Sequence, residues 1–265
     1  MKNSPIGIFD SGIGGLTIAH ALKKKLPNEN IIYFGDTEHL PYGDKSKTAI
    51  QSFSKRIVNF LISKNCKAIV IACNSASSVA CDVVEKEAKN LSVFNVIDPV
   101  VQEAVRICAD YNIGIIGTKT TIQSNIYKYK IKELCNSSKV SSLATPLLAP
   151  MIEEGFINEK ISHAIIENYL SHKTLSNIDH LILACTHYPL IYNEINTYYN
   201  SSVNIINSSN IVAQHVADSL KDKNLLNNTI ETKHIFYVSN YTKSFEESAK
   251  FFFKKEIQLK EVCLF

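Results

Sequence analysis

The chain has 265 residues, of which 45% are hydrophobic and 20% are charged, and its formal net charge is +3. These values are ordinary for a soluble globular protein, and the length accommodates one large α/β domain or two of ordinary size. The lysines are scattered along the chain rather than gathered in one stripe. This pattern predicts solvated helix faces and no nucleic-acid surface.

The hydropathy of the chain and its cysteines indicate the cellular compartment of the protein. No segment approaches the roughly 18 consecutive apolar residues that span a bilayer, and no apolar leader precedes the strand-like run at Ile6. We therefore expect a cytoplasmic protein without a membrane partner. The seven cysteines are odd in number and include no CxxC pair. Reduced thiols are expected, rather than a disulfide framework or a zinc ribbon.

Strand and helix patterns alternate through the first hundred residues. Short apolar runs predict strands, and apolar residues at helical spacing predict the helices between them. Such alternation with short connections is typical of a mostly parallel sheet covered by helices on both faces. The expected strands are 6–9, 31–34, 68–73 and 93–97, and the expected helices are 16–26, 46–64 and 76–88.

The alternation continues to the end of the chain. Strands are expected at 113–116, 140–144, 181–185, 203–206 and 234–238, the last of these being the final strand. Helices are expected at 100–110, up to about 134, at 159–172, from Pro189 to about 199, at 211–220 and at 243–254. The intervening loops include one with Pro146 and Pro150 and a polar break at 207–210.

One sequence pattern occurs twice in the chain. Ile113-Gly-Ile-Ile116 repeats the pattern of Ile6-Gly-Ile-Phe9, and in each half the third strand ends in Ala-Cys. This favours a structural duplication. We expect two similar α/β domains, each a mostly parallel sheet flanked by helices, with the active site in the cleft between them. The first domain would be discontinuous (1–98 plus 211–265), the second would be 99–210, and Asp98-Pro99 would mark the first boundary.

The two Ala-Cys strands carry the candidate reactive groups, Cys73 and Cys185. Ligands of open parallel sheets bind beyond the carboxyl ends of the strands, beside helix N-termini. Polar side chains follow both cysteines, although a core position would need none. The cysteines at 66, 81, 108 and 135 are interpreted instead as small buried hydrophobes.

A thiol beside a helix N-terminus is expected to have a lowered pKa, which favours the thiolate. Two such bases facing each other across a cleft can remove a proton from one face of a carbon and return another to the opposite face. Asp10 and His187 are candidates for tuning the thiols. Each has an alternative interpretation as a capping or core residue.

The loop Asp10-Ser-Gly-Ile-Gly-Gly15 supports a dinucleotide site only weakly, because Thr17 stands where the third fingerprint glycine would fall. Its glycines are interpreted as permitting a tight turn and close approach of backbone to a small ligand. Pro41-Tyr-Gly43 is interpreted as a turn from which Tyr42 could reach the cleft.

A metal site would have to combine Cys73, Cys185, His187 and Asp10. The i, i+2 spacing of Cys185 and His187 is awkward for shared ligation, and no second closely spaced ligand pair exists. The sequence therefore predicts no metal.

Several motifs together resemble the cofactor-independent glutamate racemases of the aspartate/glutamate racemase family. They are Asp10-Ser-Gly-Ile-Gly-Gly15, Pro41-Tyr-Gly43, Cys73-Asn-Ser-Ala-Ser77, Gly117-Thr118 with Thr121, the segment 146–155 with Glu153-Glu154, and Cys185-Thr-His-Tyr-Pro189. The resemblance implies interconversion of L- and D-glutamate without a cofactor, supply of D-glutamate for peptidoglycan, and a homodimer.

The resemblance also implies roles for individual residues. Cys73 and Cys185 would be the two proton donors and acceptors, assisted by Asp10, Glu153 and His187. Whether Glu153 or Glu154 is the assisting carboxylate stays open. The implied substrate contacts are Asp10, Ser11, Tyr42, Gly43, Asn74, Ser75, Thr118, Thr121, Thr186 and His187. Ser75 stands where the family usually has threonine, so the hydroxyl is kept and a methyl is lost.

Three other functions remain as alternatives. An aspartate racemase, or another racemase of the two-cysteine group, would keep the mechanism and change the substrate. A thiol hydrolase would use one cysteine as nucleophile with His187 as base, and would leave the second cysteine motif unexplained. A two-lobed ligand-binding module of periplasmic type would need neither thiol.

Overall fold

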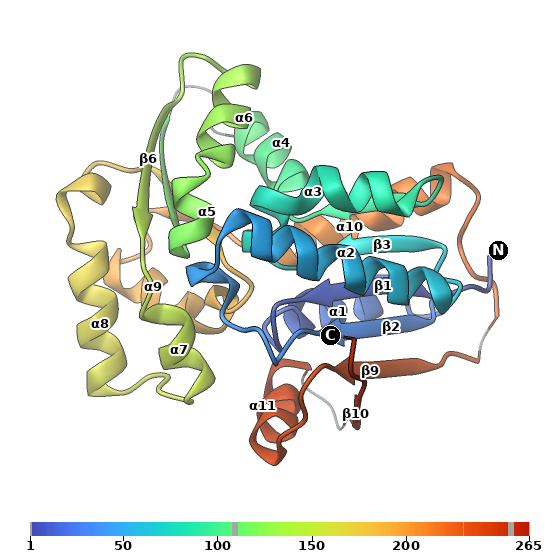
Figure 1. Cartoon of the computed structure of the whole chain (residues 1–265). Helices are drawn as coiled ribbons and strands as arrows, with labels where there is room; N and C mark the ends of the chain where they lie inside the picture. The colour runs from blue at the N-terminus through green and yellow to red at the C-terminus, as the bar shows by residue number, and fades with distance from the viewer. Residues whose placement is uncertain (1, 108–110, 230, 254–256, 265) are drawn as a thin grey trace.

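The computed structural model describes residues 2–107, 111–229, 231–253 and 257–264. Two separate sheets organise this part of the chain, and every strand pair in them is parallel (Figure 1). Helices flank both sheets. The predicted α/β class with two similar units is confirmed.

The first sheet has the strand order β10-β9-β2-β1-β3-β4. Its strands are β1 (Ile6–Asp10), β2 (Ile31–Gly35), β3 (Ala68–Ile71), β4 (Ser92–Asn95), β9 (His234–Val238) and β10 (Leu259–Glu261). The helices of this part are α1 (Leu16–Lys25), α2 (Lys47–Ser63), α3 (Asn74–Ala88), α10 (Ser208–Asp222) and α11 (Lys243–Phe253), with a 3-10 turn η1 (Tyr42–Asp44).

Alternation along the strands divides the core of the first unit into two layers. Phe9 and Ile71 point to one face and pack with the apolar sides of α2 and α3. Ile8 and Val70 point to the other face and pack with α1 and α10. Successive strand residues face opposite sides of a sheet, so a strand covered on both faces must be apolar throughout. This is why the first three strands read as unbroken apolar runs.

The second sheet has the strand order β6-β5-β7-β8. This order matches β2-β1-β3-β4 of the first sheet, so the duplication predicted from the Ile-Gly-Ile echo is present in the topology. The strands are β5 (Asn112–Gly117), β6 (Lys139–Ala144), β7 (His180–Ala184) and β8 (Asn204–Ile206). The helices are α4 (Asp98–Ile107), α5 (Lys119–Gln123), α6 (Ile126–Leu134), α7 (Leu148–Glu153), α8 (Lys160–Leu170) and α9 (Tyr192–Tyr198), with 3-10 turns η2 (Lys173–Leu175) and η3 (Tyr188–Ile191).

Two predicted loops are helical. The segment with Pro146 and Pro150 contains α7, and Pro150 is its third residue. A proline is tolerated in a first turn because the N–H groups there have no intrahelical acceptor. The expected polar break at 207–210 is the start of α10, where the Asn207 side chain caps the helix by accepting from the Ser209 N–H.

Two other predictions also need correction. The helix expected to reach 134 is split into α5 and α6 at Asn125, whose φ of 55° is left-handed. The strand at 234–238 is not the last, because β10 pairs with β9 at the edge of the first sheet. The helices expected at 100–110 and 243–254 are present as α4 and α11, and residues 108–110 and 254 lie outside the described part of the chain.

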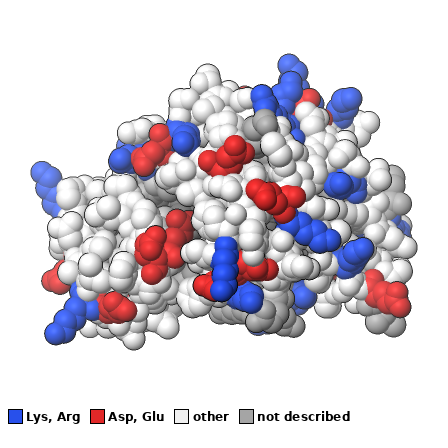
Figure 2. Space-filling view, turned by 60° about the horizontal axis from the view of Figure 1, so that its bottom comes forward, with Lys and Arg blue, Asp and Glu red and all other residues white. Residues whose placement is uncertain are grey.

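The surface bears charges of both signs. On the face shown in Figure 2, basic and acidic side chains are interspersed. In the described ranges, we find no helix with the length and apolar character that a membrane crossing requires.

Candidate active site

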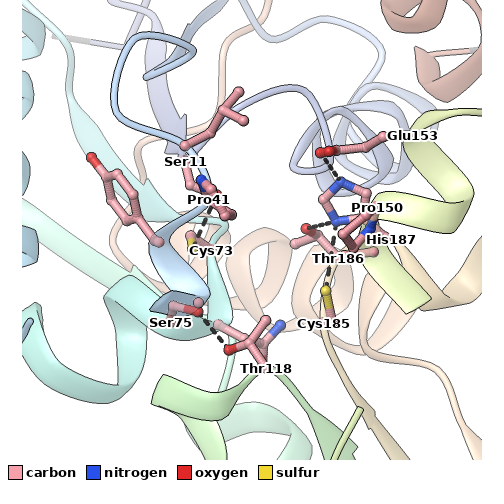
Figure 3. A pocket seen from close by; sticks show the side chains of 15 residues that line it. Ser11, Pro41, Cys73, Ser75, Thr118, Pro150, Glu153, Cys185, Thr186 and His187 are labelled. Atoms are coloured by element: carbon pink, nitrogen blue, oxygen red, sulfur yellow. Dashed lines mark hydrogen bonds and ion pairs between the residues drawn. The ribbon is translucent and has the colours of Figure 1, made fainter. Parts of the chain in front are cut away.

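A cavity of about 240 Å³ lies where the carboxyl ends of the two sheets face each other. Both units contribute to its wall, which consists of Ser11, Leu40, Pro41, Tyr42, Gly43, Cys73, Asn74, Ser75, Thr118, Ala149, Pro150, Glu153, Cys185, Thr186 and His187. Most of the residues singled out in the sequence meet here. Figure 3 shows Cys73 and Cys185 on opposite sides of this pocket.

Cys73 stands between β3 and α3, as the N-cap of that helix. Its Sγ accepts from the Ala76 N–H at 3.4 Å and lies 3.7 Å from the Ser11 hydroxyl. Burial, reinforced by the negative charge of Asp10, raises the pKa of the Cys73 thiol to about 12. The expectation of a lowered pKa at this helix terminus is therefore wrong. The amide and hydroxyl bonds favour the thiolate, but desolvation outweighs them.

Cys185 directly follows β7 and has a different environment. Its Sγ lies 3.5 Å from His187 Nδ1, and His187 Nε2 lies 2.8 Å from Glu153 Oε1 (Figure 3). Burial alone would lower the pKa of His187, but Cys185 and Glu153 raise it well above its ordinary value. This side of the pocket therefore holds a relay of thiol, imidazole and carboxylate.

The geometry distinguishes the two candidate carboxylates at the end of α7. Glu153 lines the pocket and pairs with His187, whereas Glu154 is exposed to solvent. Of the two, Glu153 is therefore the carboxylate that lies in the pocket and contacts His187.

Asp10 is fully buried at the end of β1 and does not form part of the cavity wall. Its Oδ2 accepts from the Gly12 N–H at 3.1 Å, and its Oδ1 has no hydrogen-bond partner among the described residues. Burial raises the pKa of Asp10, although His187 and the amides of Gly15 and Gly12 oppose the shift. Asp10 influences Cys73 by charge from behind the wall.

Three hydroxyls join the two units at the floor of the pocket. Ser75 Oγ lies 2.8 Å from Thr118 Oγ1, and Thr118 Oγ1 lies 3.0 Å from Thr121 Oγ1. Thr121 is buried behind the other two and is absent from the wall. Ser75 and Thr118 can offer their hydroxyls as donors to a carboxylate in the pocket. Thr121 contacts these hydroxyls but does not line the pocket itself.

Tyr42 and Gly43 form part of the wall, but the Tyr42 hydroxyl does not face a ligand. It donates to the buried Asp36 Oδ2 at 2.6 Å. The Gly43 carbonyl accepts from Thr120 Oγ1 at 2.9 Å, which ties η1 to α5. The prediction that Tyr42 reaches into the cleft is therefore wrong for its hydroxyl group.

Four apolar wall residues were not predicted as site residues from the sequence: Leu40, Pro41, Ala149 and Pro150. They flank or belong to motifs that were noticed, so proximity to Tyr42 and Glu153 was the available clue. They give the cavity wall an apolar part, which no pattern of polar residues indicates.

The glycines at 14 and 15 leave room for neighbouring side chains of the protein. A Cβ on Gly14 would lie 2.3 Å from His187 Cε1, and a Cβ on Gly15 would lie 2.6 Å from Asp10 Cβ. The missing side chains let His187 and Asp10 take up their positions.

The remaining cysteines differ in burial. Cys66 is buried, as expected for a small hydrophobe, whereas Cys81 and Cys135 are only half-buried, and Cys108 lies outside the described residues. Within the described ranges, no group of three or more His, Cys, Asp or Glu side chains is arranged to hold a metal ion.

Comparison with known proteins gives consistent results. A family model described as Asp/Glu/hydantoin racemase matches residues 16–216. A glutamate racemase of Caldanaerobacter subterraneus subsp. tengcongensis is 42% identical over 97% of this chain and 93% of that protein. One from Chlorobaculum tepidum is 39% identical over 97% of this chain and 94% of that protein.

Among solved structures, a glutamate racemase from Francisella tularensis subsp. tularensis SCHU S4 in complex with D-glutamate superposes with a TM-score of 0.94. The two sequences are 40% identical, and the match covers 100% of this chain and 99% of the other. The resemblance read from the sequence motifs is confirmed.

Proposed function

The chain belongs to the Asp/Glu/hydantoin racemase family, and from this premise we propose that it interconverts L- and D-glutamate by proton exchange at Cα. One observation carries the proposal. Two buried thiols from equivalent strand ends, Cys73 and Cys185, line opposite sides of one small pocket. Inversion at a carbon needs a base on one face and an acid on the other, and this arrangement supplies both.

The two thiols would start in different protonation states. The raised pKa of Cys73 keeps it a thiol at neutral pH, ready to donate a proton. A protonated His187, held by Glu153, would stabilise a thiolate at Cys185. Cys185 then takes the Cα proton as Cys73 delivers its own to the opposite face. The reverse reaction exchanges these roles, so protons balance in each direction.

The pocket also has to stabilise the carbanion that forms when the Cα proton leaves. Leu40, Pro41, Ala149 and Pro150 exclude water, which strengthens every electrostatic interaction inside. The hydroxyls of Ser11, Ser75, Thr118 and Thr186 and the Asn74 amide are proposed to hold the two carboxylates of glutamate. Asp10 would adjust Cys73 by charge.

We propose that the two units act as domains, 1–98 plus 211–265 and 99–210. Support comes from the separate sheets, since β9 and β10 return to the first of them. A hinge where the chain crosses between the units would open the pocket for the substrate. We further propose a cytoplasmic homodimer that supplies D-glutamate for peptidoglycan, without a cofactor.

Glutamate is favoured over aspartate as substrate because the relatives with about 40% identity over nearly the whole chain carry that activity in their names. The test is incubation of the purified protein with L-glutamate and, in parallel, L-aspartate, with chiral chromatography of the products. The proposal expects D-glutamate to accumulate to about half of the total. Faster racemisation of aspartate, or none of either, would overturn it.

A further inference from the structure

Asn74 presents its amide to the pocket in one defined orientation. It is the first residue of α3, follows Cys73 directly, is 3% exposed and lines the cavity. Its Oδ1 accepts a hydrogen bond from the Tyr127 hydroxyl at 2.8 Å. Its Nδ2 is buried and has no hydrogen-bond partner among the described residues. One end of the amide is thus satisfied, and the donor end is left for a ligand.

Tyr127 reaches Asn74 from the other unit. It lies in the first turn of α6, just after the left-handed Asn125 that separates α6 from α5. The side chain is 3% exposed, and its hydroxyl has no other hydrogen-bond partner in the described part of the chain. The bond therefore joins α6 of the second unit to α3 of the first.

Tyr127 remains a donor over the whole range of working pH. Burial raises the pKa of its phenol, and Asp98 and Cys185 raise it further. A protonated phenol with a single available acceptor will turn its hydrogen toward Asn74 Oδ1. An amide has one acceptor end and one donor end, so fixing Oδ1 also fixes Nδ2.

We propose that Tyr127 is a positioning residue that orients the Asn74 amide so that Nδ2 donates to a carboxylate of the substrate. The inference rests on the proposed function and extends it to substrate selection. An unpaired buried N–H is costly, and a carboxylate relieves that cost because it is purely an acceptor. The opposite orientation would turn Oδ1 toward the carboxylate and repel it.

The central test is a double-mutant cycle on glutamate binding. Tyr127→Phe removes the hydroxyl and keeps the ring, and its Kd for D-glutamate should rise about tenfold, as expected for one buried hydrogen bond. In an Asn74→Ala background the same substitution should add almost nothing, because the amide it orients is gone. Tyr129→Phe, on the same helix but 65% exposed, is the matched control and should bind as the wild type does.

Selectivity supplies a measurement that a purely structural role would not change. In Tyr127→Phe the freed amide can turn Oδ1 toward a ligand, so glutamine and isoglutamine should lose less affinity than glutamate. Asn74→Asp keeps the acceptor for Tyr127 but removes the donor, and should bind glutamate more weakly while unfolding at a similar temperature. It tests the donor end even if Tyr127→Phe folds poorly.

The role of Tyr127 would be overturned if Tyr127→Phe and Asn74→Ala had independent effects on the Kd for glutamate. It would also be overturned if Tyr127→Phe left the discrimination between glutamate and its amides unchanged. Racemisation by the wild type is measured in the same experiment. A wild type that racemises glutamate while the two substitutions act independently refutes only the positioning role. A wild type that neither binds nor racemises glutamate refutes the proposed function and the role of Tyr127 with it.

Discussion

The imidazole of His187 lies 2.8 Å from the carboxylate of Glu153, and this pairing orients its other nitrogen toward the thiol of Cys185. On the opposite side of the pocket, Cys73 has a carboxylate behind it and no imidazole in direct contact among the described residues. The two halves of a duplicated fold therefore surround their cysteines differently. In the proposed reaction, this asymmetry would let Cys73 act as the acid while Cys185 acts as the base.

Glu153→Gln should shift the pH dependence of the reaction. The folded pKa of His187 lies above its ordinary value of 6.5, so the imidazolium is kept to a higher pH than in a free imidazole and is lost as the pH rises through the raised value. Removing the Glu153 charge lowers that pKa, and the alkaline limb of kcat/KM should move to lower pH. The rate at neutral pH should fall roughly 10- to 150-fold, the range of one hydrogen bond to a charged group.

Glu154→Gln is the matched control for this shift, because the neighbouring side chain is exposed and makes no contact with His187. Its pH profile should overlay that of the wild type. Equal profiles for Glu153→Gln and the wild type would show that the carboxylate does not act through His187.

Gly14→Ala should impair catalysis more than folding. The added methyl would lie 2.3 Å from His187 Cε1 and 2.7 Å from Thr186 Oγ1, so the imidazole must move. A displacement of about 1 Å at a reacting group costs on the order of 100-fold in rate. Steady-state kinetics and thermal unfolding would separate the two effects.

Gly12→Ala provides the comparison within the same loop, since its Cβ would meet only Leu40 Cδ2 at 3.5 Å, an ordinary contact. A loss of rate as large as that of Gly14→Ala would argue against a specific clash with His187.

Glu29→Gln should destabilise the first unit. Glu29 pairs with Lys67 at 2.5 Å, and both side chains are at most 2% exposed. Lys67 also donates to the carbonyls of Lys2 and Leu225, so it joins three segments at the amino end of the sheet. Leaving a buried cation without its partner costs about 3–5 kcal/mol of unfolding free energy. Urea denaturation measures this.

The pair of Lys55, which is exposed, and Glu87, which is half-buried, is the control for the buried pair. Glu87→Gln should change the free energy of unfolding by less than about 1 kcal/mol, because solvent screens such pairs. Similar losses for Glu29→Gln and Glu87→Gln would show that the ammonium of Lys67 finds water when its partner is removed.

Cys73→Ala and Cys185→Ala should each abolish racemisation from both enantiomers, with losses of at least about 100-fold, since neither thiol can replace the other on its own face. Cys263→Ala, at an exposed position, should leave the rate unchanged. Substantial activity in one of the two pocket variants would favour a single nucleophilic thiol, as in a hydrolase.

The sequence predicted the elements that depend on local periodicity. Apolar runs such as Ile6–Asp10 and the apolar stripe of Lys47–Ser63 indicated their strand and helix, and the Ile-Gly-Ile echo indicated the duplication that the matching strand orders show. The short edge strand Leu259–Glu261 was missed because its alternation covers only three residues, two of them exposed. This strand is defined by its pairing with β9 rather than by the strand propensity of its residues.

At the site, sequence patterns identified the residue types but not their environments. Cys73 was placed correctly beside a helix terminus, yet its pKa depends on burial and on Asp10, which only the folded chain brings close. Tyr127 gave no clue, because an aromatic residue at a helical position reads as core. Its hydroxyl meets Asn74 only where the folded chain brings the start of α6 beside the start of α3.

The most direct test of two opposed thiols is the fate of the Cα proton in heavy water. With L-glutamate in D₂O, two opposed thiols should give, at low conversion, D-glutamate with one deuterium at Cα and recovered L-glutamate with none, as mass spectrometry of the separated enantiomers would show. In the proposed mechanism the Cys73 donor would already have exchanged with solvent, whereas Cys185 could return only the proton it has just removed. Two opposed thiols would be contradicted by deuterium that appears early in the recovered L-glutamate, or by D-glutamate that keeps its original Cα proton.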